Sequence, residues 1–391
     1  MANIEDYLRW RGDLTFQERP FNEIDNLILA VMSYSDIDDI LTEEDQMVPL
    51  PELRDRYFEK HTREEVAERK TYTGPIPLML DPMADGARFR DTRVSWFHSH
   101  ISNEENVQMA ALTFFLPNGT AYVSFRGTDD TIVGWKEDFE FSYLVGTTGQ
   151  REAVQYMDHL LEVDMPIMIG GHSKGGNFAV YASAFCRQEI QDRITDVWNN
   201  DGPGFPRSVL AEEGYQRIRD RIHSIIPENS IVGILMHNDV EHKVIASSEK
   251  GAAQHDARSW QVVRDHFEEV DQRSLKSFIF DETITRWLHD LSDEERHSFI
   301  ESVFGVLEDT GLMTLDEINT SWITTYPAII QSLKNLPKEK RDEVIRIFGQ
   351  LLIKYRKVLG ESVKETVKEN VMAQGKQMLE KIREPSQLSG M

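Results

Sequence analysis

Cysteine is nearly absent from this chain: Cys186 is the only one in 391 residues, so no intramolecular disulfide can form. Basic side chains are in deficit, since 43 Lys and Arg face 67 Asp and Glu and the formal net charge is −24. Proteins bind nucleic-acid phosphates through clustered Lys and Arg, so this deficit argues against a nucleic-acid partner. No apolar run approaches the roughly 20 residues of a membrane span, and the acidic start Met1–Asp6 does not resemble a secretory signal. These absences predict a cytoplasmic protein.

Metal-ligand spacing is also lacking. His98 and His100 form a close pair, but no further ligand lies near them in the sequence, and a structural zinc site needs four ligands. We therefore predict neither a metal site nor a cofactor. A hydrophobic content of 40% and seven Trp indicate a folded chain, and its length suits one large domain plus an appendage.

The most informative motif that is present is Gly171-x-Ser173-x-Gly175. It follows the short apolar run Ile167–Gly170 and leads into a helix-compatible stretch from Phe178 onward. A strand, a tight turn and a helix in this order are typical of a nucleophile elbow. The glycines remove Cβ atoms that would collide in the turn, and the following helix N-terminus stabilises a developing oxyanion. The motif predicts Ser173 as a nucleophile.

A second motif lies upstream. The β-rich runs Met109–Leu116 and Ala121–Phe125 are joined by a Pro-Asn-Gly turn and predict a hairpin. The second run ends in Arg126-Gly127-Thr128. In a hydrolase of this layout, one oxyanion amide follows an early core strand and the other follows the nucleophile. We therefore expect the amides of Thr128 and Lys174 to be the donors, the alternative being that residues 126–128 are an ordinary strand-end turn.

Together these motifs resemble a known family. Phe125–Thr128 with Trp135 and Asp138 downstream, and Gly171–Gly176 after an apolar strand, resemble the class 3 (fungal-type) lipases. The chain is more similar still to a bacterial family of lipase-like α/β-hydrolases of unknown function. The resemblance covers about residues 20–265. It implies an α/β-hydrolase fold, with a mostly parallel sheet flanked by helices, and acyl-ester chemistry.

A serine nucleophile needs a general base, which in this fold follows the serine in the chain. The candidates are His223, His237, His242, His255, His266, His289 and His297. We expect His237 and His242 to lie on a hairpin formed by residues 231–236 and 243–246, and His289 and His297 to lie on solvated helices. His255 is preferred because it lies in a loop after the last predicted strand, where this fold carries its base. The alternative is an ordinary polar loop histidine.

Several carboxylates are candidates for the acid that orients the base. Asp201 follows a predicted strand at the sheet edge where α/β proteins assemble their sites. Class 3 lipases carry their acid one strand later, where this chain has Asn229 or Ser230 and so departs from the family pattern. Asp201 is preferred narrowly, with Glu228 and Asp239 as alternative acids. A structural turn role for Asp201 stays open, because it precedes Gly-Pro-Gly.

The chain divides into two predicted regions, a hydrolase domain at 1–270 and a helical region at 271–391. Within the first, residues 1–80 are mainly helical, with apolar residues at helical spacing over 21–32 and a capping box at Thr62. This segment either packs on the sheet or covers the site as a lid. In the second region we expect helix starts near Asp281, Ser292, Leu315 and Pro337.

The last helical stretch differs in charge from the rest. Residues 334–384 carry 13 Lys and Arg against 8 Asp and Glu, a net +5, while the remainder carries −29. A basic amphipathic helix can lie on an anionic membrane. Mixed charges and the interrupting Gly360 and Gly375 favour docking on the acidic domain or a homo-oligomer contact instead.

The sequence thus predicts a serine hydrolase that cleaves a small-molecule or lipid ester through an acyl-enzyme, with Ser173, His255 and Asp201 as its triad. The alternative is a hydrolase-like scaffold without turnover that acts as an interaction protein, because fold alone does not fix function.

Overall fold

The chain is seen here in a computed structural model that describes residues 2–383, except 43, 103, 105–106, 129–139, 142–143 and 309–330. Within these ranges, no helix combines the length and apolar character needed to cross a membrane.

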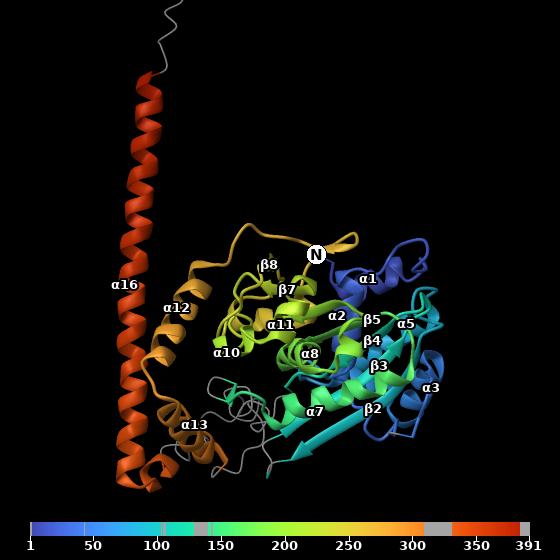
Figure 1. Ribbon diagram of the computed structural model, residues 1–391. Coiled ribbons are helices and arrows are strands. Elements are labelled where there is room, and N and C mark those ends of the chain that lie inside the picture. The colour runs from blue at the N-terminus through green and yellow to red at the C-terminus, as the bar shows by residue number, and fades with distance from the viewer. Residues whose placement is uncertain are drawn as a thin grey trace, which may run out of the picture.

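A single eight-stranded sheet forms the centre of the molecule (Figure 1). Its strands are β1 (Val48–Pro49), β2 (Arg93–Ser102), β3 (Val107–Phe115), β4 (Ala121–Phe125), β5 (Ile167–His172), β6 (Ile194–Asn200), β7 (Ile222–Pro227) and β8 (His242–Ile245). They lie side by side in chain order. The pairs from β1 to β4 are antiparallel and those from β4 to β8 are parallel. The predicted hairpin over 109–125 is confirmed as β3 and β4.

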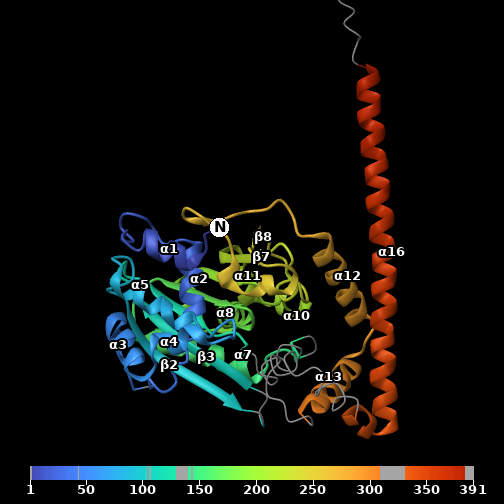
Figure 2. The same ribbon diagram turned by 180° about the vertical axis from the view of Figure 1, so that it is seen from behind.

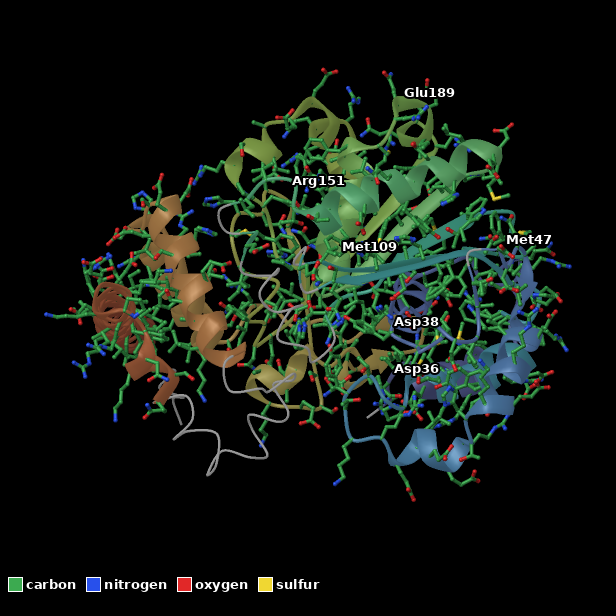
Figure 3. The ribbon with its side chains drawn as sticks, turned by 90° about the horizontal axis from the view of Figure 1, so that it is seen from below. Asp36, Asp38, Met47, Met109, Arg151 and Glu189 are labelled. Atoms are coloured by element: carbon green, nitrogen blue, oxygen red, sulfur yellow. The ribbon has the colours of Figure 1, made fainter. Side chains whose placement is uncertain are left out.

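Helices cover both faces of the sheet, which confirms the predicted α/β fold. The N-terminal cover comprises α1 (Ile4–Arg11), α2 (Glu23–Met32), α3 (Leu50–Lys60), α4 (Arg63–Glu68), the 3-10 helix η1 (Ile76–Met79) and α5 (Leu80–Asp85). The opposite face carries α7 (Thr148–Tyr156), η2 (Met157–Glu162), α8 (Lys174–Phe185), α9 (Gln188–Gln191), α10 (Arg207–Leu210), α11 (Glu213–Ile218) and η3 (Arg219–Arg221). Figure 3 shows Arg151 of α7 on one side of Met109 of β3, and Asp36 and Asp38 on the other.

Alternating side chains on the strands explain this layering, because successive residues of a strand point to opposite faces. Met168 of β5 packs in the same apolar cluster as the N-terminal helices. Its neighbours Ile167 and Ile169 pack with Phe178 of α8 in a second cluster. The expected cap of α4 is confirmed, since the Thr62 side chain accepts from the Glu65 amide.

After β8 the chain passes through two 3-10 helices and a short two-stranded sheet before it turns helical. These elements are η4 (Gly251–His255), η5 (Ala257–Ser259), β9 (Val262–Val263) and β10 (His266–Phe267). The helices that follow are α12 (Leu275–His289), α13 (Asp293–Glu308) and α16 (Lys338–Arg383). Figure 2 shows α16 as a long rod beside α12 and α13, at one flank of the sheet domain.

Four local expectations concern the second half of the chain. The hairpin expected from residues 231–236 and 243–246 is wrong, because residues 231–236 form turns rather than a strand. The helix expected near Asp281 begins earlier, at Leu275, because the Ser274 side chain caps it by accepting from the Ser277 amide. The helix expected at Ser292 is confirmed as α13, where Ser292 accepts from the Glu295 amide. The start expected near Leu315 lies outside the described residues.

Candidate active site

The turn between β5 and α8 is as tight as its glycines suggest. Ser173 has φ 58° and ψ −133° and immediately precedes the first residue of α8. A Cβ on Gly171 would lie 2.2 Å from the Gly175 carbonyl carbon, and one on Gly175 would lie 2.1 Å from the Phe125 oxygen. The strained conformation of Ser173, which costs on the order of 1–3 kcal/mol, is thus held by backbone contacts that only glycine permits.

Three side chains from distant parts of the chain meet at this turn. His255 Nε2 lies 2.9 Å from Ser173 Oγ, and His255 Nδ1 lies 2.6 Å from Asp201 Oδ2. An ionised carboxylate only accepts hydrogen bonds, so Nδ1 carries the proton and donates it to Asp201. The lone pair of Nε2 then faces the serine hydroxyl. Ser173 and Asp201 are buried, while the His255 side chain is 21% exposed.

Further contacts fix the carboxylate of Asp201. Its Oδ1 accepts from the Ser230 hydroxyl at 2.5 Å and from the Gly233 amide at 3.1 Å, which leaves Oδ2 for His255. Asp201 has φ 52° at the end of β6, and its amide donates to the Ile225 carbonyl on β7. The carboxylate at this sheet edge therefore has Oδ1 fixed by Ser230 and Gly233, and Oδ2 directed at His255.

Residues 83–305 of this chain match the Mbeg1-like family, which is more than half of its length. The chain belongs to the Mbeg1-like family. This lipase-like family accords with the resemblance drawn from the Arg-Gly-Thr and Gly-x-Ser-x-Gly motifs; a bacterial origin stays a prediction.

Among solved structures, this Mbeg1-like chain is similar to one described as the crystal structure of M37 lipase. The two are 17% identical with a TM-score of 0.34, over 54% of this chain and 69% of that one. A comparison with curated proteins finds no match.

The segments that carry the two expected oxyanion donors, Thr128 and Lys174, both lie at the elbow of this Mbeg1-like protein. Lys174 is the first residue of α8 and directly follows Ser173. Thr128 is buried, and its carbonyl accepts from the Tyr72 hydroxyl at 2.8 Å. A Cβ on its neighbour Gly127 would lie 2.4 Å from the His172 oxygen, so the segment after β4 packs directly against the elbow. Trp135 and Asp138 lie outside the described residues.

The alternative acids are engaged elsewhere. Glu228 Oε1 accepts from the Gln254 amide group at 3.2 Å and from Asn229 at 3.4 Å. Asp239 accepts from the Tyr215 hydroxyl at 2.6 Å and from Arg219 Nε at 3.1 Å. His255 Nδ1 instead forms its hydrogen bond with the carboxylate of Asp201.

The other six candidate histidines have different partners or lie on other elements. His223 Nε2 pairs with Asp196 at 2.8 Å, and His242 Nδ1 lies 2.8 Å from the Ser224 hydroxyl. The backbone of His237 forms an isolated antiparallel β-bridge with Phe205. His266 lies on β10 beside Asp265. The remaining two are on helices, His289 on α12 and His297 on α13.

His172 is not among the predicted site residues, because the base of this fold follows the serine in the chain and His172 precedes it. His172 is buried, with Nε2 2.8 Å from the His255 carbonyl oxygen and Nδ1 3.1 Å from the Tyr34 hydroxyl. A carbonyl only accepts, so Nε2 carries the proton and Nδ1 can accept from Tyr34. Burial, and then the nearby His255, hold the pKa of His172 well below its usual range, which keeps the ring neutral for these two roles. Its only sequence signal is its place inside Gly-x-Ser-x-Gly.

Proposed function

We propose that this Mbeg1-like protein is a serine hydrolase that cleaves carboxylic esters through an acyl-enzyme. The observation that carries the proposal is the continuous hydrogen-bonded chain from Ser173 through His255 to Asp201. A nucleophile, a base in contact with it and an acid that orients the base are the three parts that such chemistry needs.

In the first half of the reaction, Ser173 Oγ attacks the carbonyl carbon of the ester while its proton passes to His255 Nε2. Asp201 stabilises the imidazolium that forms. The carbonyl electron pair moves onto oxygen, where the amides of Thr128 and Lys174 would donate to it. When the carbonyl re-forms, the C–O bond to the alcohol breaks and the alkoxide takes the proton from His255.

In the second half, His255 removes a proton from water, and the resulting hydroxide attacks the acyl-serine carbonyl. The bond to Ser173 Oγ then breaks, Oγ recovers a proton from His255, and the carboxylic acid leaves. The described groups thus supply each proton transfer.

The experiment is labelling with a fluorophosphonate probe, which reacts with an activated serine whatever the natural substrate. We expect the folded protein to be labelled at Ser173, and both Ser173→Ala and heat-unfolded protein to stay unlabelled. Folded wild-type protein that takes no label would contradict the proposal and favour the second candidate, a hydrolase-like scaffold without turnover.

A further inference from the structure

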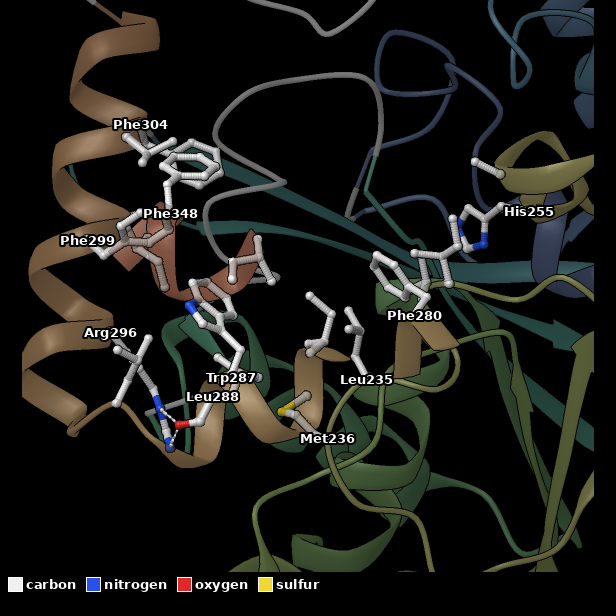
Figure 4. A pocket seen from close by; sticks show the side chains of 18 of the residues that line it. Leu235, Met236, His255, Phe280, Trp287, Leu288, Arg296, Phe299, Phe304 and Phe348 are labelled. Atoms are coloured by element: carbon white, nitrogen blue, oxygen red, sulfur yellow. Dashed lines mark hydrogen bonds between the residues drawn. The ribbon is translucent and has the colours of Figure 1, made fainter. Parts of the chain in front are cut away.

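An elongated cavity of about 800 Å³ begins at His255 and extends between the sheet domain and the C-terminal helices. This volume is within the range of about 300–1,000 Å³ that small-molecule sites occupy. Figure 4 shows His255 and Phe280 at one end, Leu235 and Met236 between, and Phe299, Phe304 and Phe348 at the other end. His255, the proposed general base, therefore contributes to the lining of this cavity.

Two separate parts of the chain supply its walls. The sheet domain contributes the turn segment after β7, with Ile231, Val232, Leu235 and Met236. The turn conformation replaces the expected strand here, and it directs these apolar side chains into the cavity. The opposite wall consists of apolar side chains from α12, α13 and α16, namely Phe280, Ile284, Trp287, Leu288, Leu291, Phe299, Ile300, Val303, Phe304, Phe348 and Leu351.

The polarity of the lining changes along the cavity. Of the five polar or charged residues found in the described part of its lining, four belong to the sheet domain, namely Tyr72, Glu249, His255 and Asp256. The fifth, Arg296, is held by the Leu288 carbonyl at 2.6 Å and by Asp293 at 3.1 Å. A ligand that fits this arrangement has a polar group near His255 and a hydrocarbon body beyond it, because burying an unpaired polar group is unfavourable.

We propose that this cavity binds the hydrocarbon chain of a medium- or long-chain acyl ester, so that the C-terminal helices form one wall of the substrate site. This inference rests on the proposed function, since the ester carbonyl must lie at Ser173 while the acyl chain passes Phe280 and continues toward Phe304. It assigns residues of α12, α13 and α16 a direct part in substrate selection. Continuity with His255 favours an acyl chain over a protein segment as the occupant.

The first measurement is kcat/KM for p-nitrophenyl acetate, butyrate, octanoate and dodecanoate, each below its micelle-forming concentration. We expect kcat/KM to rise with chain length by up to about fourfold for each methylene that is buried. Ile284→Trp adds volume inside the cavity, so the dodecanoate-to-butyrate ratio should fall at least tenfold. Thr285→Trp, at the next and exposed position of α12, is the matched control and should keep the wild-type ratio.

The second measurement separates this inference from the proposed function. Dodecanoate is titrated calorimetrically into Ser173→Ala, with and without Ile284→Trp; we expect binding that Ile284→Trp weakens. Binding of this kind without fluorophosphonate labelling of the wild type would overturn the proposed function and keep the cavity assignment. Ester cleavage without chain-length dependence, together with no dodecanoate binding, would overturn the cavity assignment and keep the proposed function. If Ile284→Trp fails to fold, competitive inhibition of wild-type butyrate hydrolysis by dodecanoate supports the assignment, and its absence contradicts it.

Discussion

At the scale of single residues, Asp201 is the most exacting test of the proposed chemistry. In Asp201→Asn the amide oxygen can still accept from Ser230 and Gly233, whereas the NH₂ group faces His255 Nδ1. The imidazole is then held in the wrong tautomer and its cation is not stabilised, so we expect kcat for ester hydrolysis to fall by up to about 10⁴-fold in a folded protein. Hydrolysis rate and melting temperature on the same preparation measure both quantities.

Glu228→Gln and Asp239→Asn are the matched controls, because these carboxylates have partners other than His255. Both should change the rate much less. A lowered melting temperature with near-normal specific activity in Asp201→Asn would assign Asp201 a structural role in its Gly-Pro-Gly turn. A fully active Asp201→Asn would transfer the acid role to Glu228 or Asp239.

His172 predicts a pH dependence of stability. Its pKa is lowered in the folded chain, so between about pH 6.5 and that lower value the unfolded chain binds a proton that the folded chain does not. Stability therefore falls as pH falls through this window, by about 1.4 kcal/mol per pH unit from this group. The contribution is fully present above pH 6.5.

His172→Phe removes that titration together with the donor to the His255 carbonyl. Urea unfolding at pH 5, 6 and 7 should show the wild type losing more stability toward pH 5 than the variant does. We also expect slower labelling of Ser173 at pH 7, because the His255 main chain is less well positioned. An equal pH slope in both proteins would contradict the assignment of a neutral, buried His172.

At the scale of elements, local patterns were sufficient wherever one short segment forms one structure. The strand, turn and helix around Ser173 follow from consecutive residues, and so does the β3–β4 hairpin. Chain order and the sheet edge also predicted that Asp201 and His255 lie near Ser173, and the hydrogen bonds among them agree with that proximity. Their roles as acid and base stay predictions. The hydrogen-bond partners of the site residues could not be predicted from local sequence patterns. The contact of Ser230 with Asp201 joins residues 29 positions apart, and that of Tyr34 with His172 joins residues 138 apart.

The apolar pattern predicted a strand where the side chains are buried for a reason other than sheet formation. The apolar side chains of Ile231, Val232, Leu235 and Met236 line the cavity rather than forming a strand of the sheet. The start of α12 was misplaced because Asp281 and Glu282 resemble a first helical turn. Instead, Asp281 pairs with Arg273 at 2.9 Å, and Ser274 supplies the cap. The spacing of apolar residues predicts which side chains are buried, but it does not predict which part of the protein they pack against.

At the scale of the whole molecule, the apolar cores are divided along the chain. Among the residues that the structure describes, the two clusters that flank the sheet extend no further along the chain than Phe267. A third cluster joins α12, α13 and α16, and its members begin at Ile284. This division supports the proposed boundary near residue 270, with a separate helical region after it.

Ion pairs also bind the C-terminal helices to one another. Arg286 of α12 pairs with Glu361 of α16 at 2.7 Å, and Arg346 of α16 pairs with Glu295 of α13 at 2.5 Å. The outer side of α16 exposes Ile345, Leu352 and Leu359. An anionic membrane surface and a second copy of the chain both remain predicted partners for this basic helix.

The C-terminal helices also form hydrogen bonds with the loop beside the candidate active site. The Ser277 hydroxyl of α12 donates to the Ser230 carbonyl at 2.8 Å, and the Ser274 hydroxyl donates to Asn229 Oδ1 at 2.5 Å. Ser230 in turn donates to Asp201. Removal of the C-terminal helices therefore has two expected effects: loss of one cavity wall, and a looser loop beside Asp201.

A chain that ends at residue 270 tests both effects and the domain boundary together. Because it keeps both sheet-flanking cores, we expect cooperative thermal unfolding and continued fluorophosphonate labelling of Ser173. Labelling should be slower than in the full chain, since the Ser230 loop loses its contacts with α12. The preference for dodecanoate over butyrate esters should be lost, because the wall from α12, α13 and α16 is missing. A shortened chain without a cooperative transition would contradict the boundary, and one that keeps the full chain-length preference would show that the sheet domain alone selects the acyl chain.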